Sequence, residues 1–281
     1  MKIFTHMNVD LDAVASVWAI RTFAEAYMDA EVCFRPANWD GTGLNEDKAV
    51  AVDIEAGGKG VKGKKDDDGT VHSCFATIIS KLASKNDQEA LAPLVTFIDA
   101  QDAHGSAVKF LAPEINDEAQ QIFSLTGINS VLRAFQSIFP GRDDTVIECM
   151  SEIFDGMLKA GRSRQMAKIE ANEAEILPGD NVAILRNMRH CATSYVLFER
   201  GVKAIVYVDG HSLGIFREGS QTLRMDHPQL REIVEQQGEL DQWFAHSSGF
   251  LFSRGTRKAP ATSPSNVDPV KLAETANSLF S

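Results

Sequence analysis

Three short apolar runs in the first hundred residues each end at or beside an acidic or imidazole side chain. These runs, each with its polar residue, are Lys2–Thr5 with His6, Ala49–Ile54 with Asp53, and Leu94–Ile98 with Asp99. After the first run, Leu11, Val14, Ala15 and Trp18 recur at helical spacing, which predicts a helix reaching to about residue 28. Short strands separated by helices favour an α/β domain with a mostly parallel sheet, in which ligands gather at the carboxyl ends of the strands. The three runs therefore predict a site at one edge of a sheet.

The rest of the chain changes character twice. Residues 117–176 have helical periodicity and little strand signal, and Pro178 and Gly179 end that stretch. Beyond it, the pattern predicts a second, smaller α/β unit. Its strands are expected at residues 181–185, 203–208, 212–216 and 249–252, and its helices at residues 192–200, after Pro228 and from Pro269. The fold class is thus two α/β domains, 1–110 and 180–281, joined by a helical connector, 111–179, whose long helices could mediate a homodimer.

Composition limits the classes of partner. The chain of 281 residues has 39 acidic and 28 basic side chains, so its formal charge is −11. That charge argues against a general nucleic-acid coat or an anionic-membrane binder, because phosphates are repelled on average. The four cysteines show no CxxC pair, no signal peptide is visible, and no apolar run approaches the roughly 20 residues that span a bilayer. We therefore expect a soluble, cytoplasmic protein with no membrane partner.

The densest chemical feature is the segment His6-Met7-Asn8-Val9-Asp10-Leu11-Asp12. One imidazole and two carboxylates lie there on a single strand-to-helix turn, and such a donor set suits manganese, iron or magnesium better than a metal that prefers thiolates. The alternative is that Asp10 or Asp12 only caps the helix and interacts with its positive end. Because Asp53 and Asp99 are also expected at strand ends, the pattern favours a metal site.

These residues resemble motifs of the DHH phosphoesterase superfamily. Residues 6–13 are similar to its first motif, H-x-N-P-D-x-D-A, residues 51–54 resemble the second, a strand ending in aspartate, and residues 97–99 resemble the fourth. Residues 71–79 resemble the helix of small residues that follows the third motif. The resemblance implies divalent metals, usually manganese with magnesium as the other option, that activate water to attack a phosphoester. It assigns His6 and Asp10 to one metal, Asp12 and Asp99 to the other, and Asp53 to the bridge between them.

The third motif of that superfamily, Asp-His-His, is absent. Residues 55–69, where it would fall, contain no histidine. Three readings stay open: a degenerate member without catalysis, a member that holds one metal and works weakly, or a member in which His72 or His104 substitutes. The segment instead has the glycines and lysines of a phosphate cradle or of a mobile, solvated loop. Its lysines are Lys59, Lys62, Lys64 and Lys65.

A second basic segment lies near the C-terminus, where Arg254, Arg257 and Lys258 follow a predicted strand. Arginine forms forked hydrogen bonds with phosphate, so this composition predicts an anion site, with a basic surface loop as the alternative. The preceding residues 246–250, H-S-S-G-F, resemble the H-A-S-G-F segment of the melanocyte-proliferating-gene exonuclease family, which is related to the DHH group. They resemble more loosely the G-G-H motif of DHH-associated C-terminal domains. The resemblance implies that four residues face the substrate phosphate across an interdomain cleft: His246, Ser248, Gly249 and Arg254.

Two functional hypotheses follow. The first is hydrolysis of a phosphoester or phosphoanhydride in a small nucleotide, an oligonucleotide or polyphosphate, assisted by one or two manganese ions. Such an enzyme would be a phosphodiesterase, an exonuclease or a pyrophosphatase-like hydrolase of the DHH type. The second is a catalytically degenerate relative that binds a nucleotide or phosphorylated ligand in a regulatory role, and the missing Asp-His-His motif is its basis. Both imply a phosphate-containing small molecule or short oligonucleotide as the partner.

Overall fold

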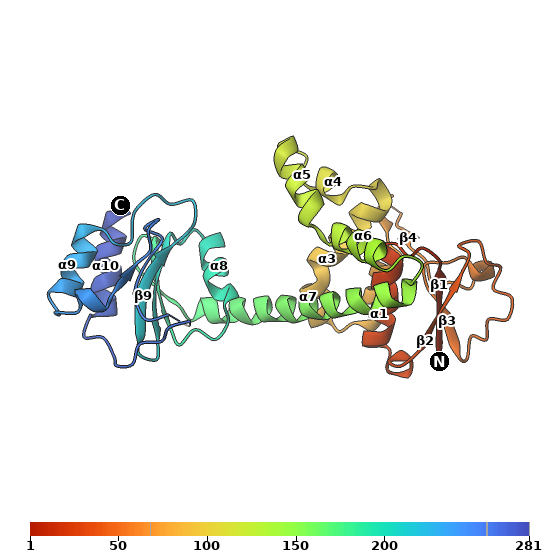
Figure 1. The fold of residues 1–281 in the computed structure, drawn as a ribbon, viewed down its shortest axis with the longest axis horizontal. Helices are drawn as coiled ribbons and strands as arrows, with labels where there is room; N and C mark the ends of the chain where they lie inside the picture. Colours follow the sequence, from red (N-terminus) through yellow and green to blue (C-terminus); the bar gives the residue numbers. More distant parts are fainter. Residues whose placement is uncertain (68, 257, 281) are drawn as a thin grey trace. The chain divides into compact units, whose positions relative to one another are not determined.

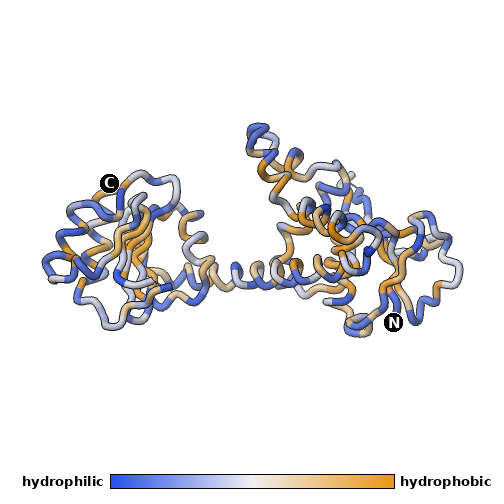
Figure 2. The backbone as a smooth tube through the Cα atoms, in the orientation of Figure 1, coloured by the Kyte–Doolittle hydropathy of each residue, from blue (hydrophilic) through white to orange (hydrophobic). Residues whose placement is uncertain are grey.

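The computed structural model describes residues 1–67, 69–256 and 258–280 (Figure 1). The chain forms two compact units, Met1–Arg162 and Ser163–Ser281, whose boundary falls inside helix α7 (Asp143–Asn172). Each unit has its own hydrophobic core, and Figure 2 shows apolar residues concentrated on the strands and on the helices beside them. The predicted boundaries at residues 110 and 179, between a metal-binding domain, a helical connector and a substrate-binding domain, stay a prediction. In the described part of the chain, no helix has the length and apolar character that crossing a bilayer requires.

Strand β1 (Lys2–His6) is the middle strand of a three-stranded parallel sheet in the first unit. It pairs with β2 (Glu31–Arg35) on one side and with β3 (Ala49–Ala51) on the other, so that His6 lies opposite Arg35. Because the strands are parallel, their carboxyl ends lie at one edge of the sheet. The structure thus confirms the predicted α/β class with a parallel sheet, and it confirms the first two predicted strands.

Helix α1 (Leu11–Phe23) follows β1 and runs through the core of the first unit. Its residues from Leu11 to Ile20 are all buried, because the sheet lies on one side and α2 (Cys74–Leu82), α3 (Lys85–His104) and α7 pack on the others. A helix that is apolar on all sides is stable only when it is enclosed in this way. It ends at Phe23, before residue 28, and a short 3-10 turn, η1 (Glu25–Tyr27), follows.

The third apolar run, Leu94–Ile98, is not a strand, and that prediction was wrong. The run lies within α3, which begins after Ser84, whose hydroxyl accepts a hydrogen bond from the amide of Asp87. Leu94 and Ile98 of the run belong to a buried helical face that begins at Ala90. The helical repeat over this longer stretch, and not the short apolar run, determines the structure. The buried residues of α3 are Ala90, Leu91, Leu94, Ile98 and Ala100. Asp99 therefore lies on a helix and not at a strand end.

A short hairpin connects β3 to α2. After the 3-10 turn η2 (Ala56–Gly58), strands β4 (Lys64–Lys65) and β5 (Val71–His72) pair in antiparallel fashion. His72, which the resemblance at residues 71–79 places in a helix, is the last residue of β5. Ser73 caps α2, and its hydroxyl accepts a hydrogen bond from the amide of Ala76.

The predicted helical stretch at residues 117–176 is confirmed over most of its length. Helices α5 (Asp117–Thr126), α6 (Ile128–Ile138) and α7 fill it, and α4 (Ala107–Leu111) precedes them. Helices α6 and α7 pack on the core of the first unit, whereas α5 buries none of its residues. The last two residues of the stretch form strand β6 instead.

The second unit contains a six-stranded sheet of order β10-β11-β9-β8-β7-β6. Only β7 and β8 pair in parallel, and the other neighbours are antiparallel. The four predicted strands and three predicted helices of this region are all present. The elements are β6 (Glu175–Ile176), β7 (Val182–Arg186), α8 (Ala192–Glu199), β8 (Ala204–Asp209), β9 (Ser212–Arg217), α9 (Pro228–Glu235), η3 (Leu240–Gln242), β10 (Phe244–Ala245), β11 (Leu251–Arg254) and α10 (Pro269–Leu279).

Candidate metal site

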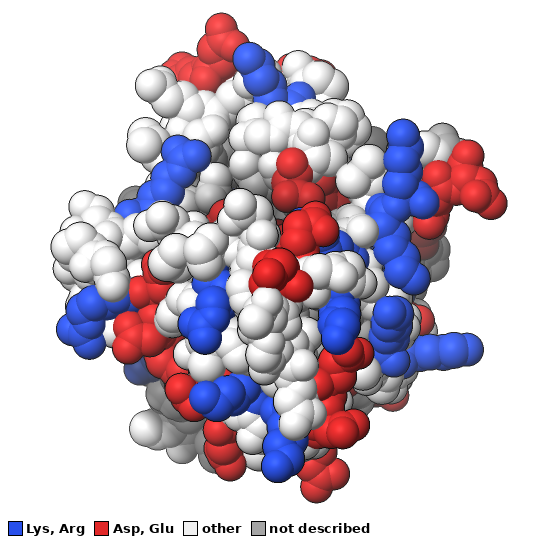
Figure 3. Space-filling model, turned by 90° about the vertical axis from the view of Figure 1, so that its right-hand side faces the viewer, with Lys and Arg blue, Asp and Glu red and all other residues white. Residues whose placement is uncertain are grey.

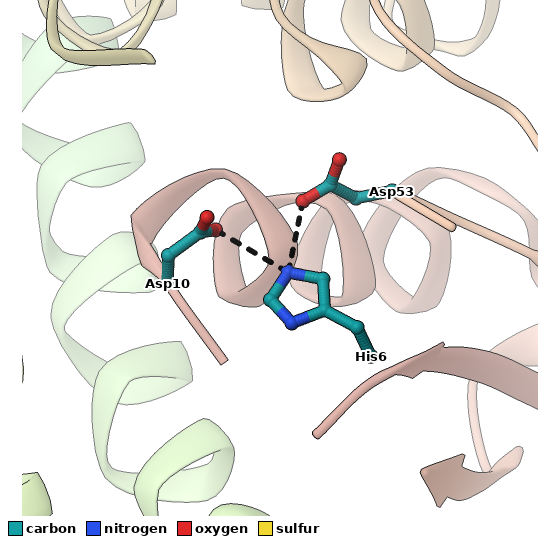
Figure 4. Close-up of side chains that lie close together, drawn as sticks. All are labelled: His6, Asp10 and Asp53. Atoms are coloured by element: carbon teal, nitrogen blue, oxygen red, sulfur yellow. Dashed lines mark hydrogen bonds and ion pairs between the residues drawn. The ribbon is translucent and has the colours of Figure 1, made fainter. Parts of the chain in front are cut away.

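His6, the last residue of β1, lies beside Asp10 and Asp53 at the carboxyl edge of the parallel sheet (Figure 4). Its Nε2 atom is 3.2 Å from Oδ2 of Asp53 and 3.8 Å from Oδ1 of Asp10. One ligand atom from each of the three residues lies within 4.8 Å of the other two. The Nδ1 atom of the same ring donates a hydrogen bond to the carbonyl of Met7 at 3.0 Å. This bond orients the imidazole so that Nε2 faces the two carboxylates.

Two residues in the left-handed backbone region shape the loops that carry these side chains. Asp53 has φ = 51° and Asn8 has φ = 54°, and aspartate and asparagine tolerate this region better than most residues. The amide of Asp53 donates to the carbonyl of Val61 at 2.9 Å, and that of Asn8 donates to Oδ2 of Asp143 at 2.8 Å. Backbone conformations of this kind cluster at functional sites because the surrounding structure must hold them.

Asp12 is buried near this group, but its carboxylate is hydrogen-bonded to the N-terminus of a helix. Its two oxygens accept hydrogen bonds from the amides of Cys74 and Phe75, each at 2.8 Å. These are the first two amides of α2, and they have no partner within the helix itself. Asp12 therefore caps a helix distant in the sequence, whereas Asp10 caps its own helix through the amide of Ala13 at 3.0 Å. The capping alternative thus holds for Asp10, where it coexists with the metal-ligand geometry, whereas Asp12 caps a different helix from the one expected.

Asp99, which lies on α3, contacts the N-terminus of the same helix α2. Its Oδ1 accepts hydrogen bonds from the amide of Ser73 at 2.9 Å and from the hydroxyl of Ser73 at 2.6 Å, and its Oδ2 is 3.0 Å from Nδ1 of His72. The Nε2 atom of His72 is 3.0 Å from Oδ2 of Asp66. Of the two histidines that could substitute for the missing motif, His72 thus contacts a predicted ligand. The ring of His104 instead stacks on Phe110.

The carboxylates of this region repel one another. Burial, followed by the charge of Asp53, raises the pKa of Asp12 to about 7. Loss of hydration, followed by the charge of Asp53, also raises the pKa of Asp102, which lies one helical turn after Asp99 on α3. Hydrogen bonds with Asp10 and then with Asp53 raise the pKa of His6 to about 10. The group has an excess of negative charge that a bound cation would relieve.

A cavity of about 320 Å³ lies beside these carboxylates. Asp102 belongs to its lining, and the sequence prediction did not include it because residues 94–98 of α3 were expected to form a strand that ends before it. Asp99 and Asp102 are three positions apart, which would place them on one face of a helix, and this spacing was the signal in the sequence. Figure 3 shows a face on which acidic side chains gather near the centre with lysine and arginine side chains around them. The lining of the cavity includes Asn8, Asp10, Asp12, Gln101, Asp102, Asn129, Arg133 and Gln136.

The three clustered residues fit one divalent cation. Two atoms that bind one ion at about 2 Å lie no more than about 4 Å apart, so ligand atoms within 4.8 Å of one another need only small rotations. Two carboxylates and one imidazole suit manganese or magnesium. Among the residues that the structure describes, His6, Asp10 and Asp53 are the one group with such spacing. Asp12 and Asp99, assigned to a second metal by resemblance, are each bonded to the start of α2.

The predicted substrate-binding segment of the second unit forms the turn between β10 and β11. The Nδ1 atom of His246 is 2.8 Å from the hydroxyl of Ser248, and the amide of Gly249 donates to the carbonyl of His246 at 2.8 Å. Gly249 has φ = 70°, and a Cβ there would lie within 2.7 Å of Cγ of Arg224. The structure thus brings three of the four predicted residues together and requires glycine at this turn.

Two arginines that the sequence did not single out contact this turn. Nη1 of Arg224 donates to the carbonyl of Ser247 at 3.2 Å, and Nη2 of Arg217 donates to the carbonyl of Ser248 at 3.5 Å. Strand β9, which ends at Arg217, pairs with β11, and this pairing brings the residues together. The sequence pattern predicts β9 as a strand, but it does not show that β9 pairs with β11.

Arg254 has a different role from the one predicted. Its side chain is 10% exposed, and its three nitrogens bond to Gln242 and Ser263 at 2.8–3.0 Å, with a carboxylate oxygen of Glu239 at 3.9 Å. Each nitrogen of this buried guanidinium already donates a hydrogen bond within the unit, which argues against the prediction that Arg254 faces the substrate phosphate. Arg257, the next cation of the basic segment, lies outside the described residues.

The lysine-rich segment after β3 is partly ordered by ion pairs. Lys59 lies 2.9 Å from Glu46, and Lys62 lies 3.1 Å from Glu55. Lys64 and Lys65 form strand β4. Part of the segment is therefore built into a hairpin while its four lysines stay exposed, and binding of phosphate by this segment stays a prediction.

No protein-family model and no curated protein sequence matches the chain. Solved structures do match it. The pGpG-specific phosphodiesterase PggH from Vibrio cholerae is 9% identical, with 99% of this chain and 97% of that chain covered and a TM-score of 0.28. RecJ in complex with Mg²⁺ from Thermus thermophilus is 12% identical, with 100% and 50% covered and a TM-score of 0.28. An exonuclease RecJ bound to manganese is 12% identical, with 92% and 86% covered and a TM-score of 0.29.

The resemblance to the DHH superfamily stays a prediction from the sequence motifs. The chain spans half the length of the Thermus thermophilus protein. All three TM-scores lie below 0.5. The function of this chain is therefore inferred from its own side chains.

Proposed function

We propose that the chain binds a divalent cation, preferably manganese, through His6, Asp10 and Asp53, and hydrolyses a phosphoester or phosphoanhydride there. The observation that carries this proposal is the convergence of the three side chains at the carboxyl ends of two parallel strands, within 4.8 Å of one another. The excess of negative charge around them supports it, since burial and repulsion raise the pKa of Asp12. A cation at this position would stabilise the ionised carboxylates.

Different residues of the site bind the ion, accept a proton and support the surrounding helix. A bound divalent ion lowers the pKa of water and neutralises phosphoryl oxygens. His6, Asp10 and Asp53 would hold the ion, and the hydrogen bond from Nδ1 of His6 to the carbonyl of Met7 keeps the imidazole oriented. Asp102 lines the adjacent cavity, and its raised pKa suits it to accept a proton from the attacking water. Asp12 and Asp99 hold the start of α2 in place beside the site.

We propose that the second unit contributes substrate binding through the turn at residues 246–249. Arg224 is held by Asp226 at 2.9 Å, so Arg217 supplies the positive charge beside this turn. The substrate class is a small nucleotide, an oligonucleotide or polyphosphate, because each carries phosphate oxygens for arginine to bind.

The test is manganese-dependent turnover of a chromogenic phosphodiester by the full chain. We expect Asp53→Asn to lower kcat/KM by at least about 100-fold, since a ligand to the ion is weakened. The matched control is Asp47→Asn, which changes an exposed aspartate of the same unit and leaves turnover unchanged. Equal activity of Asp53→Asn and wild type would refute the assignment of the site.

A catalytically degenerate role is the second candidate, and one observation favours it. Among the described residues, only one group has the spacing of metal ligands, and the carboxylates assigned to a second ion are bonded to α2. In this case the protein would bind a nucleotide and regulate a partner. Thermal stabilisation by a nucleotide with manganese, without any turnover of several phosphodiesters, would favour this function over hydrolysis.

A further inference from the structure

The cavity beside the metal site has one basic side chain in its lining. Among the described residues that line it, Arg133 on α6 is the one lysine or arginine, whereas Asp10, Asp12 and Asp102 contribute three carboxylates. A phosphate that enters this cavity adds negative charge to a lining that already has an excess of it. A divalent ion offsets the charge of its own carboxylate ligands, so Arg133 is the group that can offset the charge of the phosphate.

Helix α6 carries Arg133 on the face that lines this cavity. Asn129, Arg133 and Gln136 are four and then three positions apart, a spacing that places them on one face of a helix, and all three belong to the lining. Nε2 of Gln136 donates a hydrogen bond to the carbonyl of Val9 at 2.7 Å. Val9 directly precedes the metal-site residue Asp10, so this bond fixes α6, and Arg133 with it, against the loop that carries a proposed ligand.

The guanidinium of Arg133 has donors available for a ligand. The residue is exposed, and within the described part of the chain no ion pair or side-chain hydrogen bond engages it. By contrast, each nitrogen of Arg254 donates a hydrogen bond within the second unit. A guanidinium has five N–H donors in a planar fork that matches two oxygens of a phosphate. Arg133 therefore offers this fork inside the cavity that adjoins the metal site.

A smaller cavity, of about 130 Å³, adjoins the first one at Arg133. Three residues of α3 and α6 line both cavities, namely Gln101, Asn129 and Arg133. The smaller cavity also has three hydroxyl-bearing residues in its lining, Ser106, Ser124 and Ser130. Space therefore exists on both sides of Arg133, on one side for a phosphate at the metal site and on the other for a polar group bonded to that phosphate.

We propose that Arg133 binds the substrate phosphate that is attacked at the metal site. The proposal rests on the proposed function and adds to it a substrate-binding residue from helix α6. The guanidinium donates hydrogen bonds to the phosphoryl oxygens and stabilises their negative charge while water attacks the phosphorus. The first unit thus has a cation of its own for the phosphate, in addition to the one proposed in the second unit.

The test compares the full chain with Arg133→Gln and Arg133→Lys in two assays with manganese. One assay measures turnover of a chromogenic phosphodiester, and the other measures binding of inorganic phosphate by isothermal titration calorimetry. Because a hydrogen bond between charged groups changes affinity by about 10- to 150-fold, we expect Arg133→Gln to lower kcat/KM and phosphate affinity by a factor in this range. Arg133→Lys keeps the charge but loses the fork, so it should recover part of both. Manganese affinity and the midpoint of urea unfolding should stay unchanged, since Arg133 is exposed and is not one of the proposed ligands.

The matched control is Lys109→Gln on α4, which removes one exposed positive charge of the same unit from outside both cavities. It should leave both assays unchanged. Turnover and phosphate binding by Arg133→Gln equal to those of wild type would overturn the role of Arg133 and leave the proposed function intact. Equal losses in Arg133→Gln and Lys109→Gln would assign the effect to net charge and also overturn that role. Phosphate binding that depends on Arg133 in a wild-type chain without turnover would support Arg133 and overturn the proposed hydrolysis.

Discussion

Replacement of Asp12 by alanine separates its capping role from a ligand role. The side chain is 4% exposed and accepts two amide hydrogen bonds of 2.8 Å from Cys74 and Phe75, which are themselves fully buried. Without the carboxylate, these two amides have neither a protein partner nor water. A buried unpaired donor destabilises by about 1–3 kcal/mol, so Asp12→Ala should lower the free energy of unfolding by about 2–6 kcal/mol. That is a large part of the 5–15 kcal/mol typical of a domain.

The assay is urea unfolding of metal-free protein in EDTA, followed by circular dichroism. Burial raises the folded-state pKa of Asp12 to about 7, above its unfolded value of 3.8. Its contribution is therefore fully present below about pH 4 and is lost as the pH rises through 7. The loss of stability in Asp12→Ala should thus be larger at pH 5 than at pH 8. Asp10→Ala is the control. It removes only one hydrogen bond, the one that the amide of Ala13 donates, and the side chain of Asp10 is 59% exposed. Equal destabilisation by both variants, or no dependence on pH, would refute the reasoning.

Three further predictions concern metal and ligand binding and the second unit. Because the pKa of His6 is raised to about 10 in the metal-free protein, protons compete with the ion, and manganese affinity measured by calorimetry should rise from pH 6.5 to 8.5; a flat profile would contradict this. Arg254→Ala should lower the free energy of unfolding by about 3–5 kcal/mol, because it leaves the buried Glu239 without its cation, and a loss under about 1 kcal/mol in urea would count against a structural role. Arg217→Ala should weaken binding of a nucleotide at least about tenfold without changing manganese affinity, and unchanged nucleotide binding would exclude this turn from phosphate binding.

The local pattern of the sequence was enough for most elements and for part of the site. His6 and Asp53 follow apolar runs bounded by polar turns, and these runs form β1 and β3 of the parallel sheet. Once two strands are parallel, their carboxyl ends share an edge, so the meeting of these two side chains follows from the strand prediction alone. Asp10 joins them because it is the cap of the helix that follows β1.

The remaining features depend on contacts distant in the sequence. The run that ends at Asp99 has both strand propensity and helical period, and only packing of α3 on the core decides between them. The bond between Asp12 and Cys74 joins residues 62 positions apart, and no local pattern encodes it. The enclosure of Arg254 by Glu239 and Ser263 likewise depends on loops packing against β11. Long-range contacts of this kind determine whether a charged side chain serves a ligand or the fold.

The central claim is that His6, Asp10 and Asp53 hold a divalent cation. Electron paramagnetic resonance of the full chain titrated with manganese tests it directly, because the spectrum gives both the number of bound ions and any nitrogen nucleus coupled to them. We predict one tightly bound ion with the coupling of a single imidazole nitrogen. His6→Gln should lose that coupling, and Asp53→Asn should weaken binding at least about tenfold. An ion bound by wild type without nitrogen coupling, or with a spectrum identical in His6→Gln, would contradict the account.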